Sequence, residues 1–161
     1  MKGTMKVLTT IALIVLASVY ASAQEKAEDD ISILKPGDRV YSDAVNASAI
    51  FNQHGLKINT IHRSKLEGFF LNISSAAVFK TDQGAFEIIF FPEADQAGKI
   101  TVTERREGKR HIYSFTGQPQ PRPSHDVMNA AYPMQFIAKG NWFVVINDNR
   151  RLSDLLRKIL N

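Results

Sequence analysis

Three short glycine-containing turns, each set between two runs of strand-forming residues, constrain the fold of this chain most. They are Asp82-Gln83-Gly84, Glu107-Gly108-Lys109 and Lys139-Gly140-Asn141. Glycine readily adopts the positive φ that tight hairpin turns need, so each turn predicts an antiparallel pair of strands. The predicted pairs are residues 77–81 with 85–91, 100–106 with 110–116, and 134–138 with 142–146. With a further strand expected at 56–63, the sequence predicts an antiparallel β-meander of about six or seven strands.

The side-chain pattern distinguishes one strand from the others. Ile100 with Val102, and Met134 with Phe136, alternate with other residues, as in strands that bury one face. Residues 86–91 are instead apolar except for Glu87. Such a run is typical of a central strand that is covered on both faces, and a helix is the expected cover on one of them.

Two helices are expected at the ends of the domain. A C-terminal helix at 149–160 follows from a single apolar stripe at helical spacing, with Asn147 or Asp148 as its cap. The stripe consists of Leu152, Leu155, Leu156, Ile159 and Leu160. An N-terminal helix at 43–54 would begin with Ser42 as its cap and stop at Gly55. The predicted fold class is therefore α+β, with an N-terminal helix and a C-terminal amphipathic helix packed on the sheet.

The first residues have the three parts of a cleavable secretory signal peptide. Lys2 and Lys6 precede an apolar run, and Ala21-Ser22-Ala23 offers small residues at the cleavage position before Gln24. The apolar run is shorter than the roughly 20 residues that cross a bilayer, and no later segment is longer. We therefore expect a signal peptide at 1–23, a single α+β domain at 24–161, and a periplasmic or secreted protein with no transmembrane segment after cleavage.

The absence of cysteine and the small net charge exclude several kinds of bond and partner for the exported chain. There is no cysteine, so disulfides, a lipid-anchored N-terminus and thiolate metal ligands are all excluded. Of the 20 Lys and Arg residues, two lie in the signal peptide, which leaves 18 basic against 16 acidic residues, a net charge of +2. A charge this small gives no reason to expect a nucleic acid as partner. Asn46 and Asn72 begin Asn-x-Ser sequons, which matter only in a host that glycosylates them.

Motifs for catalysis are weak. The four histidines form no close pair of metal ligands, and no nucleophile elbow or phosphate-binding loop is present, so no metal or cofactor is expected. Glu87, Glu93 and Glu104 offer carboxylates, and Asp126 follows His125 in a loop. Most proteins of this size offer similar sets, and the sequence therefore favours a protein that is not an enzyme.

The densest basic cluster surrounds one of the predicted turns. Arg105, Arg106, Lys109 and Arg110 would lie close together and exposed at this hairpin tip. Guanidinium groups bind phosphates and carboxylates with a forked geometry, so the four residues are a candidate site for an anionic envelope component or an acidic protein surface. The alternative is a solvated tip whose charges keep the strand edges from aggregating.

These observations leave three functions open. The first is an exported, non-catalytic binding or accessory protein of unknown ligand. The second is a small exported hydrolase that uses carboxylate or histidine chemistry. The third is an envelope structural protein that assembles through its sheet edges.

Overall fold

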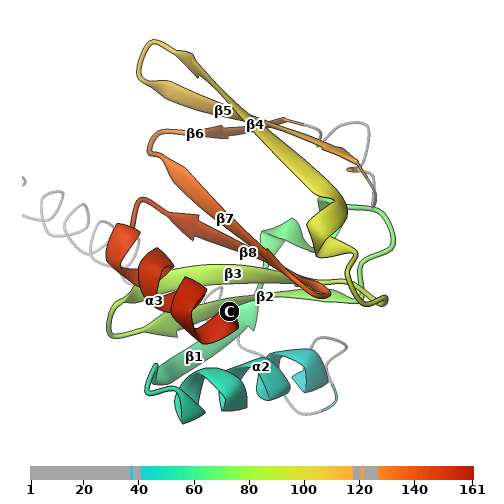
Figure 1. The fold of residues 1–161 in the computed structure, drawn as a ribbon, viewed down its shortest axis with the longest axis vertical. Helices are drawn as coiled ribbons and strands as arrows, with labels where there is room; N and C mark the ends of the chain where they lie inside the picture. The colour runs from blue at the N-terminus through green and yellow to red at the C-terminus, as the bar shows by residue number, and fades with distance from the viewer. Residues whose placement is uncertain (1–36, 38–40, 118–120, 122–126) are drawn as a thin grey trace, which may run out of the picture. The chain divides into compact units, whose positions relative to one another are not determined.

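The described part of the chain contains eight β-strands, two α-helices and two short 3-10 helices, η1 (Lys65–Gly68) and η2 (Ala97–Lys99). The predicted α+β class is confirmed (Figure 1). The structure, a computed structural model, describes residues 37, 41–117, 121 and 127–161, all of which belong to the compact unit 34–161. The predicted signal peptide at 1–23 and His125 lie outside the described residues. None of the helices described is long and apolar enough to cross a membrane.

The strands form two antiparallel sheets. The larger has the order β1-β2-β3-β8-β7 and the smaller the order β4-β5-β6. The larger sheet comprises β1 (Ile58–Arg63), β2 (Ser75–Thr81), β3 (Gly84–Phe90), β7 (Met134–Lys139) and β8 (Trp142–Asn147). The smaller comprises β4 (Ile100–Glu107), β5 (Arg110–Gly117) and β6 (Val127–Ala130).

All three predicted hairpins are present, as β2–β3, β4–β5 and β7–β8. The arrangement differs from one continuous meander because β3 pairs with β8 on the side away from β2. A strand has only two edges, so β4 cannot also pair with β3 and instead begins a second sheet. One strand, β6, was not predicted from the sequence. It has only four residues, one of them Asn129, and they show no clear strand pattern.

Two helices cover one face of the larger sheet. They are α2 (Tyr41–Gln53) and α3 (Arg150–Leu160). At the end of α2 the backbone N–H of Gly55 donates to Asn52 and that of Leu56 donates to Phe51, which is the Schellman arrangement expected of a glycine stop.

Both predicted helix caps were wrong. Ser42 lies inside α2, and the cap of α3 is Asn149, whose side-chain oxygen accepts from the N–H of Leu152 at 3.0 Å. Asp148, one of the two expected caps of α3, has a positive φ of 32° and lies in the turn before the helix. The cap therefore falls one residue later than the sequence suggested.

The larger sheet separates two apolar cores, and β3 contributes to both. Its residues Phe86, Ile88 and Phe90 belong to the core beneath the helices, whereas Ile89 belongs to the core between the two sheets. This confirms the prediction of a central strand covered on both faces, one of them by helices. We call the core beneath the helices the helix core, and the core between the two sheets the inter-sheet core. The described buried residues of the helix core are Ala44, Ala47, Phe51, Leu56, Ala77, Phe79, Phe86, Ile88, Phe90, Ile137, Val144, Ile146, Leu152, Leu156 and Leu160. Those of the inter-sheet core are Phe69, Phe70, Ala76, Ile89, Phe91, Ala97, Tyr113, Phe115, Phe143 and Val145.

Candidate functional site

A groove of about 370 Å³ opens at the margin of the inter-sheet core. It is lined by side chains of two strands from each sheet, β4 and β5 from the smaller and β7 and β8 from the larger. The lining residues are Ile100, Val102, Glu104, Tyr113, Met134, Phe136, Ala138 and Phe143. Glu104 is the single charged residue in this set, and the other seven side chains are aliphatic or aromatic, while polar atoms make up about half of the groove's exposed surface.

Strand periodicity explains why these residues face the groove. Ile100, Val102 and Glu104 are alternate residues of β4, so they point to one side of the strand. Met134, Phe136 and Ala138 are alternate residues of β7 in the same way. Since β4 and β7 are each the outermost strand of a sheet, the groove lies between two strand edges.

The floor of the groove is made of packed aromatic rings. Phe143 and Tyr113 are buried, and Phe136 contacts both. The Phe136 and Phe143 rings stack with centroids 5.7 Å apart, and the Tyr113 ring meets Phe136 edge-on at 5.2 Å. Rings held in this way by one another give a surface that is already formed before any ligand arrives.

The edge of β7 beside the groove is partly blocked. The backbone N–H of Met134 donates to the hydroxyl of Tyr113 at 2.7 Å, and Nη2 of Arg157 donates to the carbonyl of Phe136 at 3.2 Å. Met134 and Phe136 have the same phase in the strand, so these groups belong to the edge that faces away from β8. An additional strand would need the same groups, and the edge is therefore poorly suited to strand addition.

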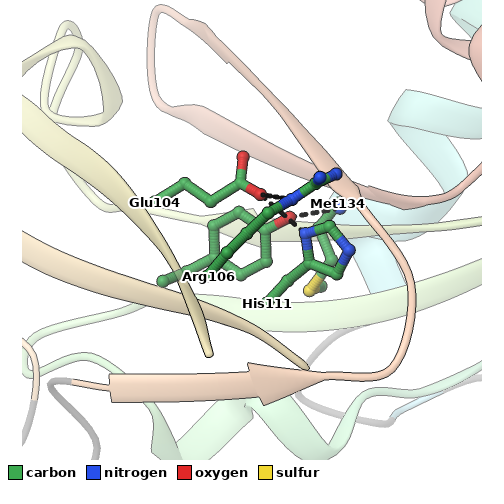
Figure 2. Close-up of polar contacts among 5 residues, drawn as sticks. Glu104, Arg106, His111 and Met134 are labelled. Atoms are coloured by element: carbon green, nitrogen blue, oxygen red, sulfur yellow. Dashed lines mark hydrogen bonds and ion pairs between the residues drawn. The ribbon is translucent and has the colours of Figure 1, made fainter. Parts of the chain in front are cut away.

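A polar cluster stands at one end of the groove, where Glu104 meets His111 and Arg106 (Figure 2). Nδ1 of His111 lies 2.6 Å from Oε1 of Glu104, and Nε of Arg106 lies 3.8 Å from the same oxygen. An ionised carboxylate only accepts hydrogen bonds, so Nδ1 of His111 carries the proton in this contact. His111 is buried and lies parallel to the ring of Tyr113, with the planes 9° apart. A buried, stacked imidazole therefore fixes the position of the groove's single carboxylate.

The four basic residues singled out from the sequence are divided between two faces of the β4–β5 hairpin. Arg106 is on the face of Glu104 and His111, because it pairs with His111 across the hairpin. Arg105 lies on the opposite face with Glu107, to which Nη2 of Arg105 is bonded at 3.0 Å. Arg110 pairs with Glu107, and Lys109 lies in the turn. All four are exposed, and an anionic partner for them stays a prediction.

The three glutamates considered for catalysis have separate surroundings. Glu87 on β3 accepts a hydrogen bond from the hydroxyl of Ser64. Glu93 is exposed in the loop after β3, where its backbone N–H donates to Gln96. Glu104 lies in the other sheet with His111, so none of the contacts of the described residues joins the three.

Histidine positions give no metal site in the described chain. His62 is buried and bonded to Thr60, His54 is exposed beyond α2, and His111 is held by Glu104. Across residues 37, 41–117, 121 and 127–161, no group of three or more His, Cys, Asp or Glu residues is placed to hold a metal ion.

The groove was not predicted from the sequence. Ile100 with Val102, and Met134 with Phe136, were each placed on one face of a strand, but nothing in the sequence shows that β4 and β7 face each other. One signal was available: the alternation Ile100, Val102, Glu104 puts a carboxylate on the buried side of a strand.

No protein-family model, curated protein or solved structure matches this chain.

Proposed function

We propose that this chain is an exported, non-catalytic binding protein that holds an elongated apolar molecule in the groove between β4 and β7. The observation that carries the proposal is the groove itself, which presents apolar and aromatic side chains from both sheets around a single carboxylate. Small-molecule sites are commonly lined by aliphatic and aromatic side chains with a few placed polar groups, and have volumes from roughly 300 to 1,000 Å³.

The energetics favour an apolar ligand. Each methylene group moved from water into such a surface contributes about 0.8 kcal/mol. The aromatic rings of the floor are already packed, so binding a ligand costs little side-chain entropy there. The partly blocked edge of β7 argues against assembly through this strand, because Tyr113 and Arg157 already bind two of its backbone groups.

A hydrolase is the second candidate, and the Glu104–His111 pair is the observation that favours it. A carboxylate that orients an imidazole is two members of a catalytic triad. The described contacts of His111 include no hydroxyl nucleophile, however, and the nearby hydroxyl of Tyr113 is bonded to the backbone of Met134. We therefore place binding ahead of hydrolysis.

Filling the groove should weaken binding strongly and leave the fold intact. Ala138 lines the groove and is exposed, so Ala138→Trp adds a large side chain there without disturbing either core. We expect at least a tenfold weaker affinity for a neutral naphthylamine dye that fluoresces in apolar surroundings, measured by titration at constant protein concentration.

The matched control is Lys139→Trp, at the next residue of β7, which is also exposed but points to the other side of the strand. Circular dichroism and thermal unfolding of both variants should resemble the wild type. Equal dye affinity in Ala138→Trp, Lys139→Trp and the wild type would remove the groove as the binding site.

Export makes a separate prediction. If residues 1–23 are a signal peptide, mass spectrometry of the protein recovered from outside the cytoplasm should show Gln24 at the N-terminus. Replacing Ala23 with a bulky residue should leave the precursor uncut. A mature protein that retains residues 1–23 would refute the assignment of the compartment.

A further inference from the structure

We infer that the ligand of the groove is a single-chain amphiphile whose head carries a hydrogen-bond donor followed by an anionic group. The inference rests on the proposed function and adds the chemistry of the head group to it. It is drawn from the two charged side chains of β4 that follow the apolar lining, Glu104 and Arg106.

Glu104 offers one unused acceptor to the groove. Both of its contacts, from Nδ1 of His111 and from Nε of Arg106, reach the same oxygen, Oε1. Figure 2 shows the second oxygen turned away from these contacts, and no described residue bonds it. Because a carboxylate oxygen accepts up to about two hydrogen bonds, Oε2 is suited to a ligand N–H or O–H.

Arg106 offers unused donors a short way along the strand. It approaches Glu104 only through Nε, at 3.8 Å, and the contacts of the described residues involve neither of its terminal nitrogens. Its side chain is 70% exposed. A guanidinium fork of this kind binds a carboxylate or a phosphate with two parallel hydrogen bonds. Lys109 and Arg110 at the same hairpin tip add positive charge, which favours an anion there.

The order of these residues sets the order of groups in the ligand. Ile100, Val102, Glu104 and Arg106 follow one another on the same side of β4, at intervals of roughly 6.5–7 Å. A molecule lying along this strand meets apolar side chains first, then the acceptor oxygen of Glu104, then the guanidinium of Arg106. Two kinds of amphiphile share this order: an N-acyl amino acid, with an amide N–H before its carboxylate, and a monoacyl glycerol phosphate, with a hydroxyl before its phosphate.

A pair of ligands that differ by one methyl group tests the donor. N-dodecanoylglycine and N-dodecanoyl-N-methylglycine have the same chain and carboxylate, but only the first has an amide N–H. Displacement of the naphthylamine dye below the micelle concentration should show about tenfold weaker binding of the N-methyl compound, as expected for a lost hydrogen bond to a charged group.

Glu104→Gln should abolish this preference. The side-chain oxygen of the glutamine can keep the bond from His111, which places the NH2 group where Oε2 was and opposes a donor with a donor. The two ligands should then bind within about twofold of each other. A preference for the N–H ligand that persists in Glu104→Gln would overturn the role of Glu104, and equal binding by the wild type would overturn the donor itself.

Arg106→Gln tests the anion. It should weaken both acyl glycines about tenfold and leave a neutral dodecyl glycoside unaffected. Arg105→Gln, on the outer face of the same strand, is the matched control and should change neither. A fourth ligand, dodecanoyl glycerol phosphate, shows whether carboxylate or phosphate is preferred.

The outcomes for the head group and for the groove are distinguishable. If Arg106→Gln does not weaken the anionic ligands while the neutral glycoside still displaces the dye, the head-group inference fails and the proposed function stands. If no dodecyl ligand displaces the dye and Ala138→Trp leaves dye binding unchanged, the proposed function fails, and the inference fails with it.

Discussion

Replacing Leu156 with alanine should lower the free energy of unfolding by about 2–5 kcal/mol. Leu156 is fully buried in the middle of α3, and the helix core around it includes Ile88 and Ile146 of the central strands. Truncation removes three carbon atoms from this core and leaves a cavity that close-packed neighbours fill only in part. Urea unfolding followed by circular dichroism, with the slope of the transition unchanged, measures the loss.

Leu155 supplies the control on the same helix. It is only partly buried at the margin of the helix core, so Leu155→Ala should cost clearly less than Leu156→Ala while changing helix propensity by the same amount. A loss below about 0.5 kcal/mol for Leu156→Ala would mean that this face of α3 does not serve the core.

Gly117→Ala should also be strongly destabilising, by about 2–6 kcal/mol. Gly117 ends β5 with a φ of +111°, and a Cβ built there would lie 2.1 Å from the carbonyl oxygen of Lys99. The positive φ costs an alanine about 1–3 kcal/mol. The backbone at Lys99 would also have to move away from the new Cβ. This displacement adds about 1–3 kcal/mol, as in other overpacked sites.

Gly108→Ala is the matched substitution in the same hairpin. Gly108 has a φ of +60°, but a Cβ there meets nothing within 4 Å, so only the conformational cost of about 1–2 kcal/mol remains. Thermal unfolding of both variants separates the cost of the positive φ from the cost of the close approach of the Lys99 carbonyl. Equal losses in Gly117→Ala and Gly108→Ala would show that the close approach of Lys99 to Gly117 is not a constraint.

The parts of the fold that the sequence predicted are those that depend on near neighbours. Glycine turns and period-two alternation placed the three hairpins, since a hairpin joins segments that are adjacent in the chain. The stripe that includes Leu152 and Leu156 placed α3, and the run around Ile88 showed that β3 is covered on both faces.

The arrangement of the sheets could not be predicted, because it depends on the pairing of β3 with β8. Both strands are apolar and antiparallel to their hairpin partners, and nothing local specifies which distant strand takes the remaining edge of each. The groove has the same origin, since its residues come from four strands and meet only when β4 faces β7.

The division of the basic cluster could have been predicted. Arg105 and Arg106 are neighbours in a strand, so their side chains must point to opposite faces. Only the contacts of Arg106 with Glu104 and of Arg105 with Glu107 show which face is which.

The pairing of β3 with β8 also has a consequence for the order in which the chain folds. Phe90 pairs with Trp142, so residues 91–141, which include the whole smaller sheet and β7, separate the neighbouring strands β3 and β8 in the chain. Closing that long loop costs conformational entropy before the contacts between β3 and β8 can stabilise it. This cost slows folding. Until β8 and α3 have been synthesised, the apolar strand β3 has an open edge, and only α2 covers its helix face, through contacts such as Phe51 with Phe86. During synthesis the chain is therefore most prone to aggregate before β8 and α3 are complete.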